Sequence, residues 1–236
     1  MTRSAETRRG FIKTASAALV SACIASTARP DAPAAAKVLN YNPSMNYRRL
    51  GKTEFMISEI ALGGHGAAGY DEQAVQNRIG VLERAVELGM NYVDTNIGWE
   101  CDVYGEAMAR SATAKRDKWF IGFASSEDKY IYRLEDQLTS AKLMGSIEDR
   151  LRSYKTDMLD MWRPVAATWA QNEPSVDRRL AITRRMCDKV VQVFDKAKQQ
   201  GKVRFLGTSE HEPKAAIPGR AAFRGHWLAT TDRRAG

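Results

Sequence analysis

The chain has few cysteines, no long apolar run and, over most of its length, no excess of charge. Its three cysteines, Cys23, Cys101 and Cys187, are too few and too widely spaced for a zinc knuckle or a disulfide scaffold. Cys101 and Cys187 are interpreted as unpaired thiols, with a bridge in an oxidising compartment as the alternative. The longest apolar run covers 12 residues. A helix needs roughly 20 apolar residues to span a bilayer, so no transmembrane span is expected.

The formal net charge of +8 is concentrated at the two ends of the chain. Residues 1–36 hold five basic and two acidic residues, and residues 213–236 hold five basic and one acidic residue. Between these ends, 26 basic and 25 acidic residues nearly balance. A balanced body offers no electrostatic footprint for phosphate backbones, which argues against a nucleic-acid partner.

The amino-terminal segment resembles a twin-arginine export signal. The stretch Thr7–Lys13 carries two adjacent arginines and precedes an alanine-rich apolar run from Thr14 to Ala25. The resemblance implies that residues 1–36 are a signal and linker, and that the twin-arginine machinery exports the folded protein to the periplasm. Small residues at 26–28 and at 34–36 both suit signal cleavage. As an alternative, Val20–Cys23 resembles a lipoprotein box, which would make Cys23 a lipid anchor.

After this segment, the apolar pattern alternates between strand and helix type. Apolar residues recur at three- and four-residue spacing from Val75 to Val86 and predict a helix over 72–88, which Gly89 ends. Strands are predicted at 57–62, 91–95, 119–124, 157–162 and 203–208, and further helices at 104–113, 130–154 and 177–200, the last ended by Gly201. This alternation indicates a parallel sheet with crossover helices.

Two α/β folds satisfy this pattern, and a missing motif decides between them. A dinucleotide-binding Rossmann unit needs G-x-G-x-x-G at its first helix, which Gly63–Gly66 does not reproduce. We therefore predict an incomplete (β/α)8 TIM barrel with about five parallel strands, over residues 37–212. Only 24 residues follow Glu212. This tail, 213–236, has neither strand nor helix periodicity and is typical of a disordered or frame-shifted end.

Four stretches, in this order, resemble the amino-terminal part of the aldo/keto reductase family. Residues 47–64 match its opening segment and first barrel strand, and 89–106 match its second strand with the motifs around Asp94 and Tyr104. Residues 146–160 match its fourth helix and strand, and 201–209 its fifth strand. The resemblance covers about residues 46–210 and implies an oxidoreductase that uses NADP(H) to reduce a carbonyl substrate.

The family chemistry, as the resemblance implies, is hydride transfer to a carbonyl while a tyrosine gives a proton to its oxygen. Asp94 and Tyr104 match the catalytic aspartate and tyrosine. A tyrosine has a pKa near 10, so the family places a lysine beside it to favour the phenolate. Gly63, Gly64 and Ser209 match positions that bind the cofactor.

Two family positions are not matched. Ala124 stands where the lysine would fall, and Val165 stands at the histidine, or Arg163 if the alignment slips by two. These departures leave two alternatives to an active enzyme. One is a non-catalytic exported barrel-type binding protein, and the other is an inactive truncated gene product. No metal site is expected.

Overall fold

The computed structural model describes residues 38–51, 53–64, 69–96, 98–125, 139–164 and 173–208. All of them belong to the compact unit Ala35–Gly236. The predicted export signal with Cys23, as well as Val165, Ser209 and the tail 213–236, lies outside these residues. Within them, no helix is long and apolar enough to cross a membrane.

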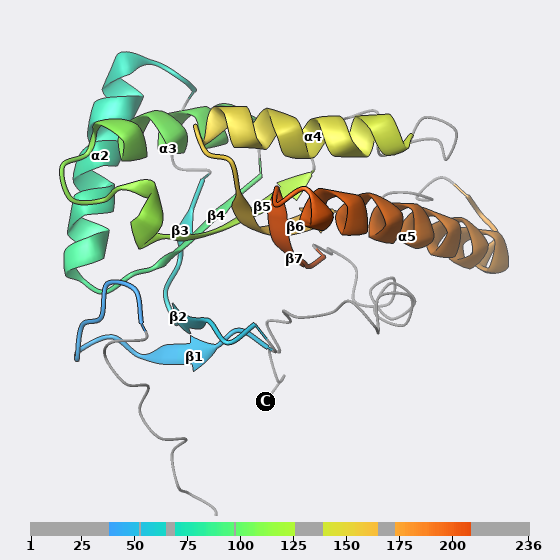
Figure 1. Ribbon diagram of the computed structural model, residues 1–236, viewed down its shortest axis with the longest axis horizontal. Coiled ribbons are helices and arrows are strands. Elements are labelled where there is room, and N and C mark those ends of the chain that lie inside the picture. The colour runs from blue at the N-terminus through green and yellow to red at the C-terminus, as the bar shows by residue number, and fades with distance from the viewer. Residues whose placement is uncertain are drawn as a thin grey trace, which may run out of the picture. The chain divides into compact units, whose positions relative to one another are not determined.

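Five parallel strands form one sheet, in which they follow one another as they do along the chain (Figure 1). The strands are β3 (Leu62–Gly63), β4 (Tyr92–Thr95), β5 (Phe120–Ser125), β6 (Leu159–Pro164) and β7 (Val203–Leu206). Each pairs in parallel with the next. This sheet confirms the predicted α/β fold, with five parallel strands arranged as in part of a (β/α)8 barrel.

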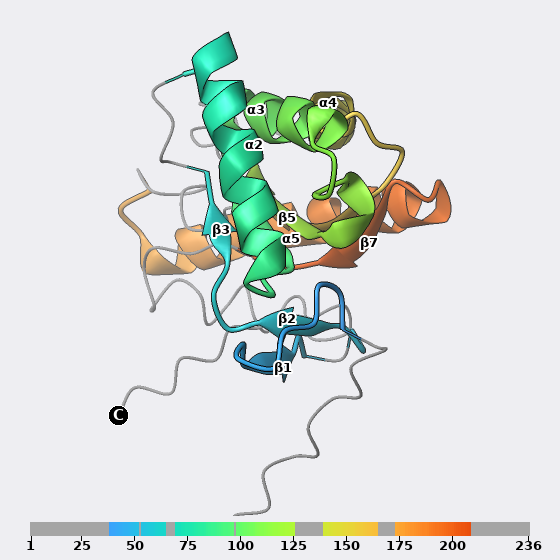
Figure 2. The same ribbon diagram turned by 90° about the vertical axis from the view of Figure 1, so that its left-hand side faces the viewer.

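Helices make the crossovers that parallel pairing requires. They are α2 (Glu72–Glu87), α3 (Gly98–Arg110), α4 (Ser140–Ser153) and α5 (Val176–Gln199), and a short 3-10 helix, η2 (Arg116–Lys118), precedes β5. Figures 1 and 2 show α2, α3 and α4 as neighbours on one side of the strands. Leu82 of α2, Leu143 of α4 and Val190 of α5 share one buried cluster with Val93 and Ile121 of the sheet. Burial of each such side chain contributes about 1.5–3 kcal/mol.

Local sequence signals set the helix ends. The Asp71 carboxylate accepts the Ala74 amide at 2.7 Å and so caps the start of α2. Gly89 (φ +85°) and Gly201 (φ +73°) follow α2 and α5 in the left-handed conformation that glycine adopts without steric penalty. The predicted helix ends at these two glycines are confirmed.

The prediction of one strand over 57–62 is wrong. The stretch is divided between β2 (Met56–Ser58), which forms an antiparallel hairpin with β1 (Tyr47–Arg49), and the barrel strand β3. The side chain of Asn91 holds the hairpin, because its Oδ1 accepts the Ser58 amide at 2.8 Å and its Nδ2 donates to the Met56 carbonyl at 3.0 Å. These contacts between residues far apart in sequence hold β2 away from the sheet, and the chain turns before β3.

The predicted helix over 104–113 also begins too late. In the structure α3 begins at Gly98 and ends at Arg110. Glu100 in its first turn accepts the Asn96 amide at 2.8 Å, and a carboxylate near a helix amino terminus is favourable. This local contact stabilises the earlier start.

Apolar side chains fill the amino end of the sheet's inner face. Leu50, Tyr92, Phe120 and Met161 form a second buried cluster, against which Phe205 packs with its ring stacked on Phe120 at 6.1 Å. The hairpin lies at this end of the strands (Figure 1). Polar chemistry is therefore left to the carboxyl end, as is usual for barrel enzymes.

Candidate functional site

The carboxyl ends of three neighbouring strands bring the predicted residues together. Gly63 of β3 pairs in register with Asp94 of β4, which pairs with Gly122 of β5. Because side chains alternate along a strand, Asp94 lies on the same face as Tyr92, whose side chain is in the inner cluster. Asp94 is therefore presented at the inner carboxyl edge of the sheet, where its side chain is 37% exposed.

Arg163 of β6 forms an ion pair with Asp94 through Nη2 and Oδ1. Its side chain is only 17% exposed. Gly207 makes room for it, since a Cβ at that position would lie 2.9 Å from the Arg163 Cγ. The pair places a guanidinium cation at the inner edge, in register beside the buried Ala124.

From the sequence, Arg163 is expected only as an alternative occupant of the histidine position. In the structure the Arg163 side chain is instead the cation paired with Asp94. Val165 lies outside the described residues. Strand alternation carried a usable signal, because Arg163 is two residues beyond Met161 and so must share its inward face.

Tyr104 lies on α3 and is fully buried. Its hydroxyl donates to the Gly63 carbonyl at 2.6 Å, and its ring belongs to the buried cluster that joins the helices to the sheet. Its proton is, however, directed at backbone rather than at open space. Whether this proton reaches a substrate stays a prediction.

A second cation, absent from the sequence analysis, contacts Tyr104. Arg78 of α2 donates from Nη1 to the Tyr104 hydroxyl at 3.0 Å, and its guanidinium lies 4.5 Å from the ring centroid. Burial raises the pKa of Tyr104 to about 12; Arg78 opposes this shift, whereas Glu100 and Asp94 add to it. Tyr104 is thus protonated at neutral pH. No sequence pattern singled out Arg78, since it lies beside the apolar stripe of α2 rather than in it.

The two glycines predicted to bind the cofactor differ in their surroundings. A Cβ at Gly63 would meet nothing within 4 Å, so this strand end borders open space. A Cβ at Gly64 would lie 2.2 Å from the Oε2 of the buried Glu100, so Gly64 is a packing position. Gly63 therefore leaves space at the strand end that pairs with Asp94, and Ser209 lies outside the described residues.

A further tyrosine lies beneath the ion pair. The Tyr92 hydroxyl would approach a Cβ on Gly122 to 2.7 Å, so glycine is required there. Burial raises the pKa of Tyr92, and the charge of Arg163 partly offsets this shift. Tyr92 therefore belongs to the core, and its hydroxyl lies against Gly122.

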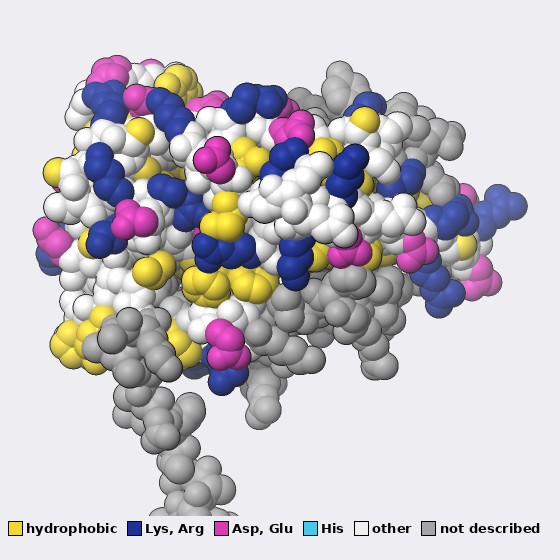
Figure 3. Space-filling model, in the orientation of Figure 1, with side chains coloured by type: hydrophobic (Ala, Val, Ile, Leu, Met, Phe, Trp, Pro, Cys, Tyr) yellow, Lys and Arg dark blue, Asp and Glu magenta, His cyan; other side chains and the backbone are white. Residues whose placement is uncertain are grey.

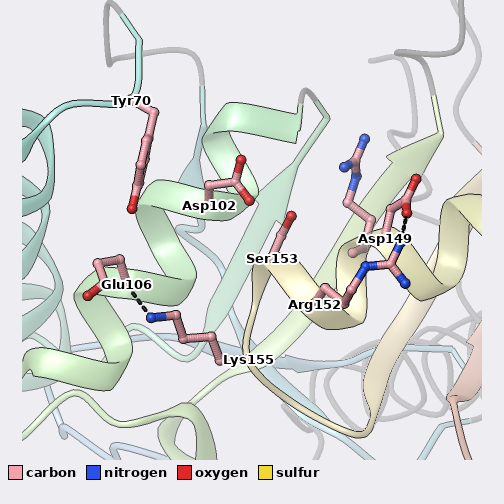
Figure 4. Close-up of a pocket in the computed structure, with 8 residues that line it drawn as sticks. Tyr70, Asp102, Glu106, Asp149, Arg152, Ser153 and Lys155 are labelled. Atoms are coloured by element: carbon pink, nitrogen blue, oxygen red, sulfur yellow. Dashed lines mark hydrogen bonds and ion pairs between the residues drawn. The ribbon is translucent and has the colours of Figure 1, made fainter.

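A charged hollow of 540 Å³ lies outside the sheet, lined by residues of α3 and α4, by the segment after α4 and by Tyr70 before α2 (Figure 4). Lys155 pairs with Glu106, and Arg152 pairs with Asp149. The charges that line the hollow are therefore largely neutralised by these ion pairs. Across the described residues, no group of His, Cys, Asp and Glu could hold a metal ion, and Cys101 and Cys187 are unpaired, as interpreted.

Five parallel strands in chain order, joined by helices, place the protein in the class of (β/α) barrel-type folds. The chain belongs to the aldo/keto reductase family, because the family model matches residues 59–216.

Comparisons with individual proteins agree with this assignment. The chain is 26% identical over 179 residues to the uncharacterized oxidoreductase YqkF of Bacillus subtilis, covering 72% of this chain and 50% of the relative. It is similar in fold to the holo form of an aldo-keto reductase from Bacillus halodurans (TM-score 0.54, 21% identity, 73% of this chain and 52% of that one). It also resembles a glycerol dehydrogenase from Gluconobacter oxydans (TM-score 0.52, 20% identity, 75% and 52%). The chain thus spans about half the length of these relatives.

Proposed function

We propose that this protein is an exported aldo/keto reductase-like oxidoreductase that reduces a carbonyl substrate with NADP(H). The observation that carries the proposal is the Asp94–Arg163 ion pair beside the open space at Gly63. A fixed cation at the inner carboxyl edge stabilises the negative charge that develops on a carbonyl oxygen during reduction. The bound reduced nicotinamide would supply the hydride.

In this proposal Asp94 orients the Arg163 guanidinium, and Arg163 binds the carbonyl oxygen. Tyr104 is the proposed proton donor, and its proton must leave the Gly63 carbonyl to reach the substrate. Arg78 supports this step, because its hydrogen bond to the phenol oxygen favours the phenolate that remains. Burial of Tyr104 disfavours the charged phenolate, so proton transfer from Tyr104 is the most demanding step of the proposed reaction.

The enzymatic proposal is tested on the full chain in two measurements. Titration with NADPH, followed by nicotinamide fluorescence, measures cofactor binding, and reduction of a small aldehyde measures turnover. We expect Arg163→Met to lower kcat about 100-fold, which is typical when one oxyanion donor is removed. Tyr104→Phe should lower it by about 10²–10⁴-fold.

Arg84→Gln on the outer face of α2 is the matched control for Arg163→Met. Arg84 is exposed and pairs with the exposed Glu87 in the same helix, so its loss should leave turnover unchanged. Aldehyde reduction that persists in Tyr104→Phe would show that Tyr104 is not the proton donor. Absence of aldehyde reduction by the unmodified chain would contradict the proposed reductase activity.

One observation favours a second candidate, a non-catalytic exported binding protein. Tyr104 is fully buried and its proton is bound to backbone, so it would act as a structural link between α3 and β3. NADPH binding without turnover of any aldehyde, together with a loss of stability in Tyr104→Phe, would support this candidate.

Export is proposed from the Thr7–Lys13 stretch alone. Changing Arg8 and Arg9 together to Lys should stop the folded protein from reaching the periplasm, measured by fractionation of cells. Periplasmic protein in the double variant would refute a twin-arginine route. Cys23→Ala separates the alternatives, because membrane attachment that depends on Cys23 would indicate a lipid anchor.

A further inference from the structure

A second cavity, of 610 Å³, lies at the amino ends of β5, β6 and β7. We call it the amino-end cavity; it is bordered by Phe55, Met108, Arg116, Trp119, Met158 and Arg204. It is separate from the Asp94–Arg163 pair at the carboxyl edge, and the proposed reduction does not use it. Its volume is within the range of sites that hold drug-sized molecules.

The wall of the amino-end cavity is largely apolar and sulfur-rich. Trp119 and Met108 are buried at its base, and Phe55 and Met158 are partly exposed beside them. The Arg204 guanidinium lies 5.5 Å from the Phe55 ring, and its Nε lies 3.0 Å from the Met158 sulfur. Aromatic rings, thioethers and guanidinium planes all pack favourably against a flat aromatic molecule.

The charge on the lining is predominantly positive. The cavity is bordered by four cations, Lys115, Arg116, Lys155 and Arg204, against two carboxylates, Asp117 and Asp160; Lys155 is already paired with Glu106. The Asp160 side chain is only 3% exposed; its Oδ2 accepts the Ile121 amide at 2.8 Å and Arg116 at 2.8 Å, and its Oδ1 forms an ion pair with Arg204 Nη1 at 3.3 Å. Asp160 therefore does not present its charge to a ligand.

Two of these cations are accessible to an incoming anion. Lys115 is exposed, and its ammonium donates to the Ala109 carbonyl at 3.0 Å. The Arg204 side chain is 40% exposed and lies 3.3 Å from Asp160. Arg116 is instead fixed inside the protein by the Trp119 and Met158 carbonyls. Figure 3 shows Lys and Arg side chains next to hydrophobic ones on the lower central part of the face it draws.

We propose that the amino-end cavity binds a small aromatic carboxylate. The ring lies against Phe55 and Met158, and the carboxylate is held by Arg204 with Lys115 beside it. An apolar wall with a net positive rim selects this chemistry over a neutral aromatic molecule, because the carboxylate gains charge-assisted hydrogen bonds that a neutral group lacks.

The test uses 2-naphthoate as the probe and the neutral 2-naphthamide as its matched counterpart, in fluorescence titrations of the full chain. We expect 2-naphthoate to bind about tenfold more tightly than 2-naphthamide, and Arg204→Gln to remove about this factor. Arg204→Lys should retain most of it. Ala109→Trp, at an exposed position of α3 on the cavity border, should weaken both probes at least about tenfold by filling the space.

Arg84→Gln removes the same charge from α2 outside the cavity and should leave both affinities unchanged. Circular dichroism of each variant reports whether it is folded. If Arg204→Gln does not fold, the loss of probe binding in Ala109→Trp still tests whether the cavity is the binding site. Equal affinity for the two probes would overturn the proposal. Unchanged 2-naphthoate binding in Ala109→Trp, or no binding by the unmodified chain up to about 1 mM, would do so as well.

Discussion

Gly105 is the point at which α3 touches the end of α4, and its replacement by Ala should be strongly destabilising. A Cβ on Gly105 would lie 1.9 Å from the Ser153 carbonyl oxygen and 2.8 Å from the Tyr154 Cα. Ordinary contact begins at about 3.4 Å, so the two helices would have to separate by about 1.5 Å. The obstructing atoms are backbone, which cannot rotate away as a side chain can.

Overpacking in a filled core usually costs about 1–3 kcal/mol and sometimes more. Ala has the higher helix propensity by about 1 kcal/mol, which offsets part of that cost. Because backbone must move, we expect Gly105→Ala to lower the free energy of unfolding by about 3 kcal/mol. Urea denaturation followed by circular dichroism measures this change.

Gly80 on α2 provides the matched control. It is exposed, and a Cβ there would meet nothing within 4 Å. Gly80→Ala should therefore stabilise the protein by about 1 kcal/mol through helix propensity alone. A Gly105→Ala variant within 1 kcal/mol of the unmodified chain would refute the predicted steric contact between α3 and α4.

Three further predictions concern charged and polar contacts. Asp160→Asn should lower the free energy of unfolding by about 3 kcal/mol in urea denaturation, because it weakens a buried ion pair; a loss below 1 kcal/mol would contradict this. Hydrogen bonds from Arg110 lower the pKa of Glu72 from 4.5 to about 2, so the stability they provide is present above pH 4.5 and is lost as the pH falls toward 2. The free energy of unfolding of Glu72→Gln, measured by acid unfolding, should not show this loss between pH 4.5 and 2. If the variant and the unmodified chain lost stability equally over this range, the ion pair would not contribute. Arg78→Met should raise the pKa of Tyr104 further, because the cation that lowers it is lost; phenolate absorbance in a pH titration, assigned with Tyr104→Phe, measures the change, and an unchanged titration would contradict the Arg78 contact.

The sequence predicted the barrel elements well where periodicity and caps act locally. The helix ending at Gly89 and the parallel order of strands follow from repeating apolar patterns and from glycine conformation, both of which neighbouring residues determine. The division of 57–62 could not be predicted in this way. It depends on hydrogen bonds from Asn91, which lies some 30 residues further along the chain.

The candidate site was predictable in part. The position of Asp94 followed from the family resemblance, and strand alternation is sufficient to place Arg163 on the inner face. The ion pair itself joins β4 to β6, and its formation depends on the space that Gly207 leaves. The contact of Arg78 with Tyr104 depends on how α2 packs on α3, which no local pattern specifies. Export, the role of Ser209 and the tail stay predictions.

The order of strands in the sheet bears on how the chain folds. Every parallel pair joins strands that are consecutive in sequence, roughly 30 to 45 residues apart, so no pairing requires closure of a much longer loop. Each strand and helix can add to an edge that is already formed while synthesis continues from the amino end. A sheet that assembles in this stepwise way can be complete over these strands while synthesis continues, and the proposed export of a folded protein would require such early folding.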